Sequence, residues 1–235
     1  MTEFECLYGY LEIMRQTCIN YGVPREIYSD RAAIFCVTPN KNKQLDKWEK
    51  LAVLHGINTQ WQRVLNELSV RQILAWSPEA KGRVERLWRT VQGQLPVWLK
   101  LHNIDTVEEA NKHLNEYAQQ YNKNYAVQSC SPDTFWLDCK QNLDDVLQCR
   151  ISRKTDKSGL FSFHSYKFAL QAPYPAYRKF EICISERGIF GKLEGKYYPV
   201  KLMENILDGL GETMPQVLQN IVYRYLYAYA KDISA

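Results

Sequence analysis

Hydrophobic residues at the start of the chain recur first at helical spacing and then at strand spacing. Apolar positions three or four residues apart predict a helix over residues 7–22, ended by the Gly22–Pro24 turn. These positions are Leu7, Leu11, Met14 and Cys18. A short strand over 26–29 follows. Asp30 stands at its C-terminal end, where open α/β sheets collect functional groups.

The order of helix and strand repeats in the next segment. A helix capped by Asn58 or Thr59 precedes a strand in "RQILAW", residues 71–76. A Ser-Pro pair then starts a long helix, and three- and four-residue spacing predicts that it buries one ridge. That ridge is Val84, Leu87 and Val91. Residues 1–126 are therefore expected to form an α/β domain, which includes a further helix begun by a capping box of Thr106 and Glu109.

The pattern changes in the second half of the chain. Residues 127–147 are expected to be a helical linker, with a short helix in "DTFWLD", residues 133–138. Short alternating runs over 148–202 predict a small all-β barrel, and residues 203–235 predict a helical tail with one apolar face.

Composition narrows the class of protein. The chain has 235 residues, a net charge of +4 and seven Cys without a CxxC pair, which favours reduced thiols over a zinc site or a disulfide framework. A leader sequence and a membrane-length apolar run are both absent from the pattern. We therefore expect a soluble protein of a prokaryotic cytosol, with no membrane partner.

The basic charge is concentrated in the predicted barrel. Residues 150–201 hold eleven Lys and Arg against four Asp and Glu, a net charge of +7, with Phe and Tyr interleaved. Such strands suit a phosphate backbone, although small barrels also carry Lys for solubility and to protect strand edges. Composition alone leaves these two interpretations evenly balanced.

Two stretches together resemble a known family. "YGVPREIYSDRAAIF" followed by "SPEAKGRVERLWRTVQGQL" resembles the catalytic core of DDE-type transposases and retroviral-type integrases, over roughly residues 7–136. The resemblance implies an RNase H-like fold, with Asp30 as the second catalytic aspartate and Glu85 as the catalytic glutamate. It also implies that these carboxylates hold Mg²⁺ or Mn²⁺, with two ions in an intact site, for DNA cleavage and strand transfer.

The resemblance also implies partners and contact residues. Lys81, Arg83 and Arg86 match a basic helix that touches DNA near the cut, and Arg89 extends that face. The predicted barrel is similar, by position and pattern, to the DNA-binding barrel of phage Mu-type transposases. There we expect Arg153, Lys154 and Lys192 to bind DNA. The expected partners are double-stranded DNA, as transposon ends and target, and a homo-oligomer or a mixed oligomer with intact transposase.

The sequence departs from the family at its start. Such cores carry a first aspartate on an earlier strand, and only "MTEFECLYG" stands here, which predicts an N-terminally truncated chain with an incomplete sheet. We expect little strand transfer from this chain alone. The alternatives are a non-catalytic DNA-binding or partner-binding remnant that modulates an intact transposase, and a nuclease of the same fold class.

Each candidate metal ligand also has a purely structural interpretation. Asp30 is placed to be a turn residue whose carboxylate accepts a hydrogen bond from a nearby backbone N–H. Glu85 lies four residues from both Lys81 and Arg89, and an intrahelical ion pair would contribute roughly 0.2–0.5 kcal/mol.

Overall fold

The N-terminal elements build a small α/β unit around one apolar helix face. The computed structural model describes residues 5–36, 59–75, 82–128, 134–164, 166–205 and 214–227, together with Thr2 and Ser131. Helix α1 (Leu7–Asn20) buries the four residues predicted from its spacing. Helix α3 (Gln60–Glu67) begins at Thr59, whose side chain and backbone form a capping box with Gln62.

Two parallel strands lie beside these helices. Strand β2 (Glu26–Ser29) pairs with β3 (Arg71–Leu74), and Glu26 stands opposite Arg71 in the register. Both strands lie where the sequence predicts them. A parallel pair connected through a helix is the α/β arrangement expected from the order of elements.

The segment around Trp136 is a strand and not the predicted helix. Strand β4 (Trp136–Leu137) pairs antiparallel with β1 (Val23–Pro24). Gly22, at φ +100°, allows this approach, because a Cβ there would stand 2.6 Å from the carbonyl oxygen of Leu137. Pairing with a distant segment overrides the local helical pattern. Within the part of the predicted linker that the structure describes, the helix is α6 (Leu143–Val146).

Helices α4 (Gly82–Leu101) and α5 (Val107–Tyr125) form a hairpin. Trp98 is buried against Tyr117, with ring centroids 5.5 Å apart, and its indole N–H donates to Gln120. The predicted buried ridge of α4 is wrong in its first half, because Val84 and Leu87 are 47% and 44% exposed. The hairpin packs through the C-terminal half of α4, which leaves these two residues outside its interface.

The C-terminal half forms one antiparallel sheet of six strands in the order β5-β8-β9-β10-β7-β6. The strands are β5 (Cys149–Lys154), β6 (Leu160–Phe163), β7 (Tyr166–Leu170), β8 (Lys179–Ser185), β9 (Gly188–Leu193) and β10 (Lys196–Asn205). The sheet curls into a half-barrel, so the predicted small all-β barrel is confirmed in part. Its concave face buries Phe161, Phe168, Phe180 and Ile182.

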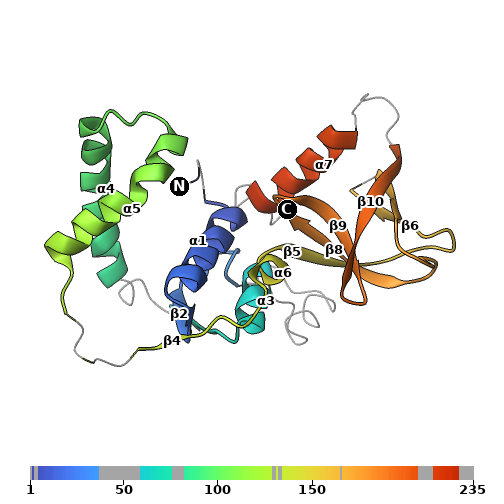
Figure 1. Cartoon of the computed structure of the whole chain (residues 1–235), viewed down its shortest axis with the longest axis horizontal. Coiled ribbons are helices and arrows are strands. Elements are labelled where there is room, and N and C mark those ends of the chain that lie inside the picture. Colours follow the sequence, from blue (N-terminus) through green and yellow to red (C-terminus); the bar gives the residue numbers. More distant parts are fainter. Residues whose placement is uncertain are drawn as a thin grey trace, which may run out of the picture.

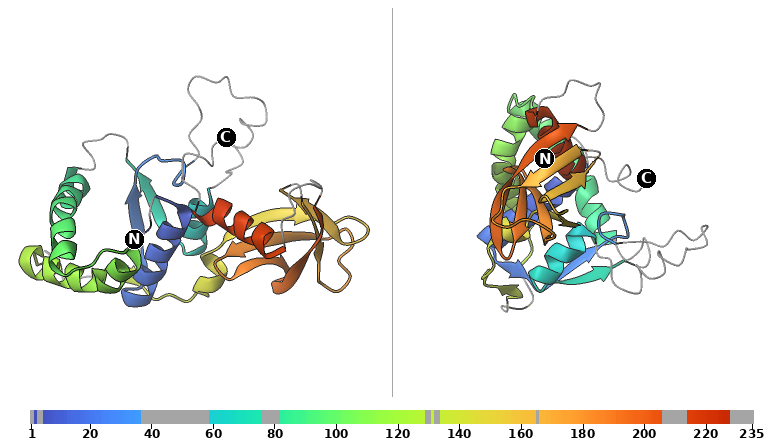
Figure 2. Two further views of the ribbon diagram at one scale, coloured as in Figure 1. Left: turned by 90° about the horizontal axis from the view of Figure 1, so that it is seen from above. Right: turned by 90° about the vertical axis from the view of Figure 1, so that its right-hand side faces the viewer.

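The tail returns to the middle of the molecule. Helix α7 (Met214–Val222) continues as the π-helical turn η2 (Tyr223–Tyr227), and Val217, Ile221 and Leu226 are buried. Figures 1 and 2 show the α4–α5 hairpin at one end, the half-barrel at the other, and α1 and α3 between them. None of the helices in the described ranges combines the length and the apolar content needed to cross a membrane.

Candidate active site

Asp30 is held at the end of β2 by the residues around it. The strand pairing continues past Ser29, whose carbonyl accepts from Ala75 N at 2.8 Å. The Gln72 amide donates both to the Ser29 hydroxyl at 2.8 Å and to the Phe35 carbonyl at 3.1 Å, which ties down the turn after the strand. Asp30 therefore has a defined position at the C-terminal edge of the parallel pair.

The Asp30 carboxylate also makes the turn hydrogen bond that its position after a strand predicts. Its Oδ1 accepts from Ala32 N at 2.9 Å, as in an Asx turn. Asp30 is half-buried, so part of its side chain still meets solvent. The turn bond orients the carboxylate.

Glu85 lies in the first turn of α4 and is exposed. Among the residues that the structure describes, no ion pair joins it to Arg89, so the structural alternative of an intrahelical pair with Arg89 finds no support. Arg86 instead donates to the Gly82 carbonyl at 3.1 Å. The alternative pairing partner, Lys81, lies outside the described residues.

One pocket brings the two carboxylates together. It has a volume of about 660 Å³ and lies between α1, the end of β2 and the start of α4. Its lining includes Ile13, Met14, Asp30, Glu85, Trp88 and Trp136. Most of the lining is therefore apolar, and it includes an acidic residue from each of two separate elements. Glu26 also borders the pocket, but its carboxylate is paired with Arg71.

The predicted DNA-contact residues that the structure describes differ in their exposure and contacts. Arg86 and Arg89 are exposed on α4, whereas the side chain of Arg83 lies outside the description, as does Lys81. On the half-barrel, Arg153 and Lys154 are exposed on β5. Their cations lie over aromatic rings, Arg153 at 5.3 Å from the Phe163 centroid and Lys154 at 6.0 Å from that of Tyr177.

Lys192 is largely buried and forms an ion pair within the fold. Its ammonium lies 2.5 Å from Asp145 Oδ1, and its side chain is only 16% exposed. Burial alone would raise the pKa of Asp145, but hydrogen bonds from Lys192 and Tyr197 and the charge of Arg150 outweigh it and lower the pKa. The charge of Lys192 is thus paired within the fold, and its contact with DNA stays a prediction.

An ionic network that sequence reasoning missed connects the half-barrel to the α/β unit. Arg150 of β5 pairs with Glu67 of α3 at 2.9 Å and with Asp145. Arg63 of α3 pairs with Glu67 and donates to the Val146 carbonyl at 3.2 Å. The partners are far apart in the sequence, so no local pattern indicates them. The network anchors the sheet beside the helices that carry the pocket.

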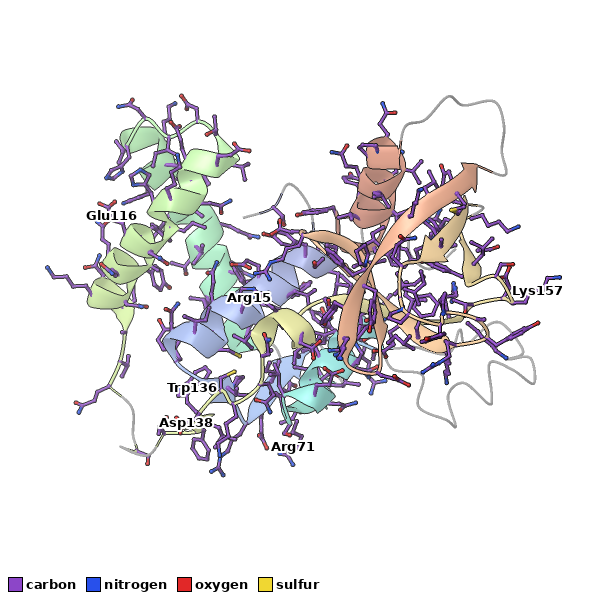
Figure 3. The ribbon with its side chains drawn as sticks, turned by 45° about the vertical axis from the view of Figure 1, so that its right-hand side comes forward. Arg15, Arg71, Glu116, Trp136, Asp138 and Lys157 are labelled. Carbon is purple, nitrogen blue, oxygen red and sulfur yellow. The ribbon has the colours of Figure 1, made fainter. Side chains whose placement is uncertain are left out.

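A second junction involves α1. Arg15, near the centre of the molecule in Figure 3, donates to Asp144 at 2.6 Å, and Asp144 also pairs with Arg187 at 2.8 Å. The Arg15 hydrogen bond is the main reason that the pKa of Asp144 is lowered. The Tyr8 ring contacts that of Tyr227 of η2 in a tilted arrangement, with centroids 4.8 Å apart, and the Tyr227 hydroxyl donates to Glu186. The tail and the sheet are thereby attached to the helix that borders the pocket.

The cysteines agree with reduced thiols. Six lie in the described part of the chain and all six are free. Cys36, six residues beyond Asp30, is buried, and burial raises the pKa of its thiol. A buried thiol that holds its proton suits a packing role better than a nucleophilic one.

Known proteins with similar sequences carry the names of transposases. The chain is 31% identical over 121 residues, 52% of its length, to "Transposase for insertion sequence IS1202" of Streptococcus pneumoniae, and the match covers 24% of that protein. It is 29% identical over 170 residues, 71% of its length, to "Putative transposase y4bF" of Sinorhizobium fredii (strain NBRC 101917 / NGR234), and this match covers 35% of that protein.

The matched segments thus span about a quarter and a third of the relatives' lengths. No family model matches the sequence. The similarity to transposases that the two motifs indicate is confirmed by these relatives.

Proposed function

We propose that this chain acts in DNA transposition as a DDE-type transposase, with Asp30 and Glu85 as metal ligands. One observation carries the proposal. Two carboxylates that are remote in the sequence line a single pocket, at the end of a parallel strand and the start of a helix. These are the two residues that the family resemblance selects, and the relatives with similar sequences are named transposases.

The donor set suits a hard divalent cation. Mg²⁺ is commonly held by one or two carboxylates, with water in its other coordination positions, so Asp30 and Glu85 fit one Mg²⁺ or Mn²⁺. Within the described ranges no group of three or more acidic, His or Cys side chains is placed to hold a metal. A two-ion site would therefore need ligands besides these. When bound, such ions activate the attacking oxygen and stabilise the leaving oxygen in phosphodiester transfer.

The chain's own residues would position and attract DNA. The Ala32 N–H orients the Asp30 carboxylate, and the Gln72 amide holds the turn that presents it. Arg86 and Arg89 are exposed one and four residues beyond Glu85, so they are placed to bind phosphates beside the pocket. Arg153 and Lys154 offer further cations on the half-barrel for non-specific contact with double-stranded DNA.

The small number of proposed metal ligands, two carboxylates, also supports a second function. With two ligands, metal binding is expected to be weak and strand transfer by these 235 residues low. The chain would then act as a non-catalytic DNA-binding protein that forms mixed oligomers with an intact transposase. Light scattering on the chain alone and mixed with such a transposase tests the oligomer.

Calorimetric titration of Mn²⁺ in the presence of short duplex DNA separates the two functions. Wild type is expected to bind, and Asp30→Asn/Glu85→Gln to bind at least about tenfold more weakly. Glu116→Gln on α5 is the matched control, because Glu116 is a 62% exposed helical glutamate remote from the pocket (Figure 3).

Two outcomes of this titration would contradict the proposed roles of Asp30 and Glu85. If wild type binds duplex DNA but no Mn²⁺, the catalytic proposal is wrong and the non-catalytic function stands. If Glu116→Gln weakens Mn²⁺ binding as much as the double variant does, the binding is a general surface effect, and Asp30 and Glu85 have no special role.

A further inference from the structure

The loop between β7 and β8, residues 171–178, presents two tyrosines in an unusual way. Tyr174 is 89% exposed and Tyr177 is 64% exposed. Both have left-handed backbones, at φ +51° and +55°. Bulky residues seldom adopt this conformation, and it persists only where surrounding contacts impose it. Both rings are largely exposed, so side-chain burial does not offset the cost of these backbone conformations.

Buried contacts hold the loop in this shape. Thr155 is 2% exposed, and its hydroxyl donates to the Pro175 carbonyl and accepts from Arg178 N at 2.8 Å. Tyr177 N donates to the Asp156 carbonyl at 3.0 Å. Pro175 packs so closely on Gly159 that a Cβ there would stand 2.5 Å from its ring. The backbone is therefore pinned to the β5–β6 turn while both tyrosine rings face solvent.

Lysines lie beside the loop, and the Lys154 ammonium lies 6.0 Å from the centroid of the Tyr177 ring. Lys154 stands directly opposite Lys179 in the β5–β8 register, and both are exposed. Like charges in this relation destabilise a sheet, so a bound anion would relieve the repulsion. Lys157, in the adjacent turn, projects from the end of the molecule opposite α5 (Figure 3). Of the acidic residues near these strands, Asp156 accepts from backbone N–H groups and Glu194 pairs with Arg178, while Glu181 lies two residues from Lys179 on β8.

We propose that Tyr174 and Tyr177 form a stacking platform for unpaired bases of single-stranded DNA, with Lys154 and Lys179 binding the adjoining phosphates. A rigid, exposed ring can stack on a base only where that base is unpaired, and lysines beside the rings match the charge of the backbone. This inference rests on the proposed function to the extent that the partner is DNA. It adds a site for unpaired nucleotides, remote from Asp30 and Glu85.

The test measures fluorescence anisotropy of a labelled oligothymidine and of a duplex of the same length with the full chain. Tyr174→Asn/Tyr177→Asn removes both rings but keeps residues that tolerate left-handed backbones, so the fold should survive, and thermal melting checks this. We expect each ring to contribute about tenfold to single-strand affinity. Duplex affinity should change less than threefold. Tyr177→Phe should bind as wild type does, because the ring stacks.

Two further variants complete the design. Tyr21→Asn, at a tyrosine 68% exposed whose ring lies 5.7 Å from that of Trp136, far from Lys157 and the loop in Figure 3, should bind as wild type does. Lys154→Gln/Lys179→Gln should weaken both DNA forms and reduce the salt dependence of binding. An acidic polypeptide, polyglutamate, is the competing occupant and should not displace the oligothymidine at matched charge.

The inference is overturned if the double asparagine variant folds and binds oligothymidine within twofold of wild type. It is equally overturned if polyglutamate competes as well as DNA. In either case, retained duplex and Mn²⁺ binding would leave the proposed function standing. Failure of wild type to bind any DNA would remove both proposals.

Discussion

The half-barrel and helix α4 both carry regularly spaced hydrophobic residues, but they differ in how far these residues are buried. In the sheet, alternate residues such as Phe168 and Ile182 are fully buried, whereas on α4 the spaced residues Val84 and Leu87 are nearly half exposed. Each strand of the sheet has neighbours that bring its apolar face onto a common core. Helix α4 meets α5 mainly at Trp98 and leaves its first turns beside the pocket. A periodic pattern thus predicts which face is apolar, but only a neighbouring element buries it.

The largest expected effect is the loss of stability when a buried ring of the half-barrel is truncated. Phe168→Ala, at a ring 1% exposed, should lower the free energy of unfolding by about 3–5 kcal/mol through lost burial and a cavity. Trp88→Ala, at a ring 57% exposed, should cost less than about 1 kcal/mol. Urea denaturation of both variants measures the difference. Equal losses would show that Trp88 is covered in solution.

A smaller effect is expected at the ionic junction. Asp145→Asn leaves Lys192 and Arg150, whose side chains are 16% and 10% exposed, short of a partner. We expect a loss of about 2–3 kcal/mol, below the value for a fully buried pair because Asp145 is partly exposed. Glu194→Gln, in a pair where Glu194 is 73% exposed, is the control and should cost under about 0.5 kcal/mol. Similar values for the two would mean that the network does not hold the sheet to α3.

The smallest effect is a pH dependence at the contact between β6 and η2. His164 bonds to the Tyr225 hydroxyl at 2.8 Å, and burial, with the charges of Arg224 and Arg153, lowers its pKa below 6.5. The unfolded chain then binds a proton more readily than the folded one. This contribution to stability is present above pH 6.5 and is lost as the pH falls through the folded pKa.

Thermal melting of wild type and His164→Asn between about pH 7.5 and 5 tests this effect. Asparagine tolerates the left-handed backbone at this position, where φ is +49°. The variant should show a shallower decline in melting temperature than wild type. Parallel curves would contradict the assignment to His164.

Much of the fold was predictable because its signals are local. Helix α1 and strands β2 and β3 lie where spacing indicates, and the cap of α3 is Thr59, one of the two predicted residues. The helix predicted around Trp136 is wrong because its backbone pairs with Val23 and Pro24, more than a hundred residues away. The predicted small barrel is a half-barrel, because alternation defines strands but does not define which strands pair at the edges.

The candidate site shows the same division. Asp30 and Glu85 were selected from two short motifs, and the pocket that contains both arises from the packing of α1, β2 and α4. Lys192 was expected to bind DNA because it lies in a basic segment. Its pairing with Asp145 depends on β9 approaching α6, for which the sequence carries no periodic signal.

The sequence by itself determined the helices, the strands and the residue types that suit metal and DNA chemistry, because these depend on neighbours within a few positions. Only the tertiary structure decided which charges remain available, since a lysine's exposure depends on what packs against it. Lys192 is neutralised inside the molecule, while Lys154 and Lys179 face each other at its surface. The same kind of residue therefore forms an ion pair within the fold at one place and stays exposed at another.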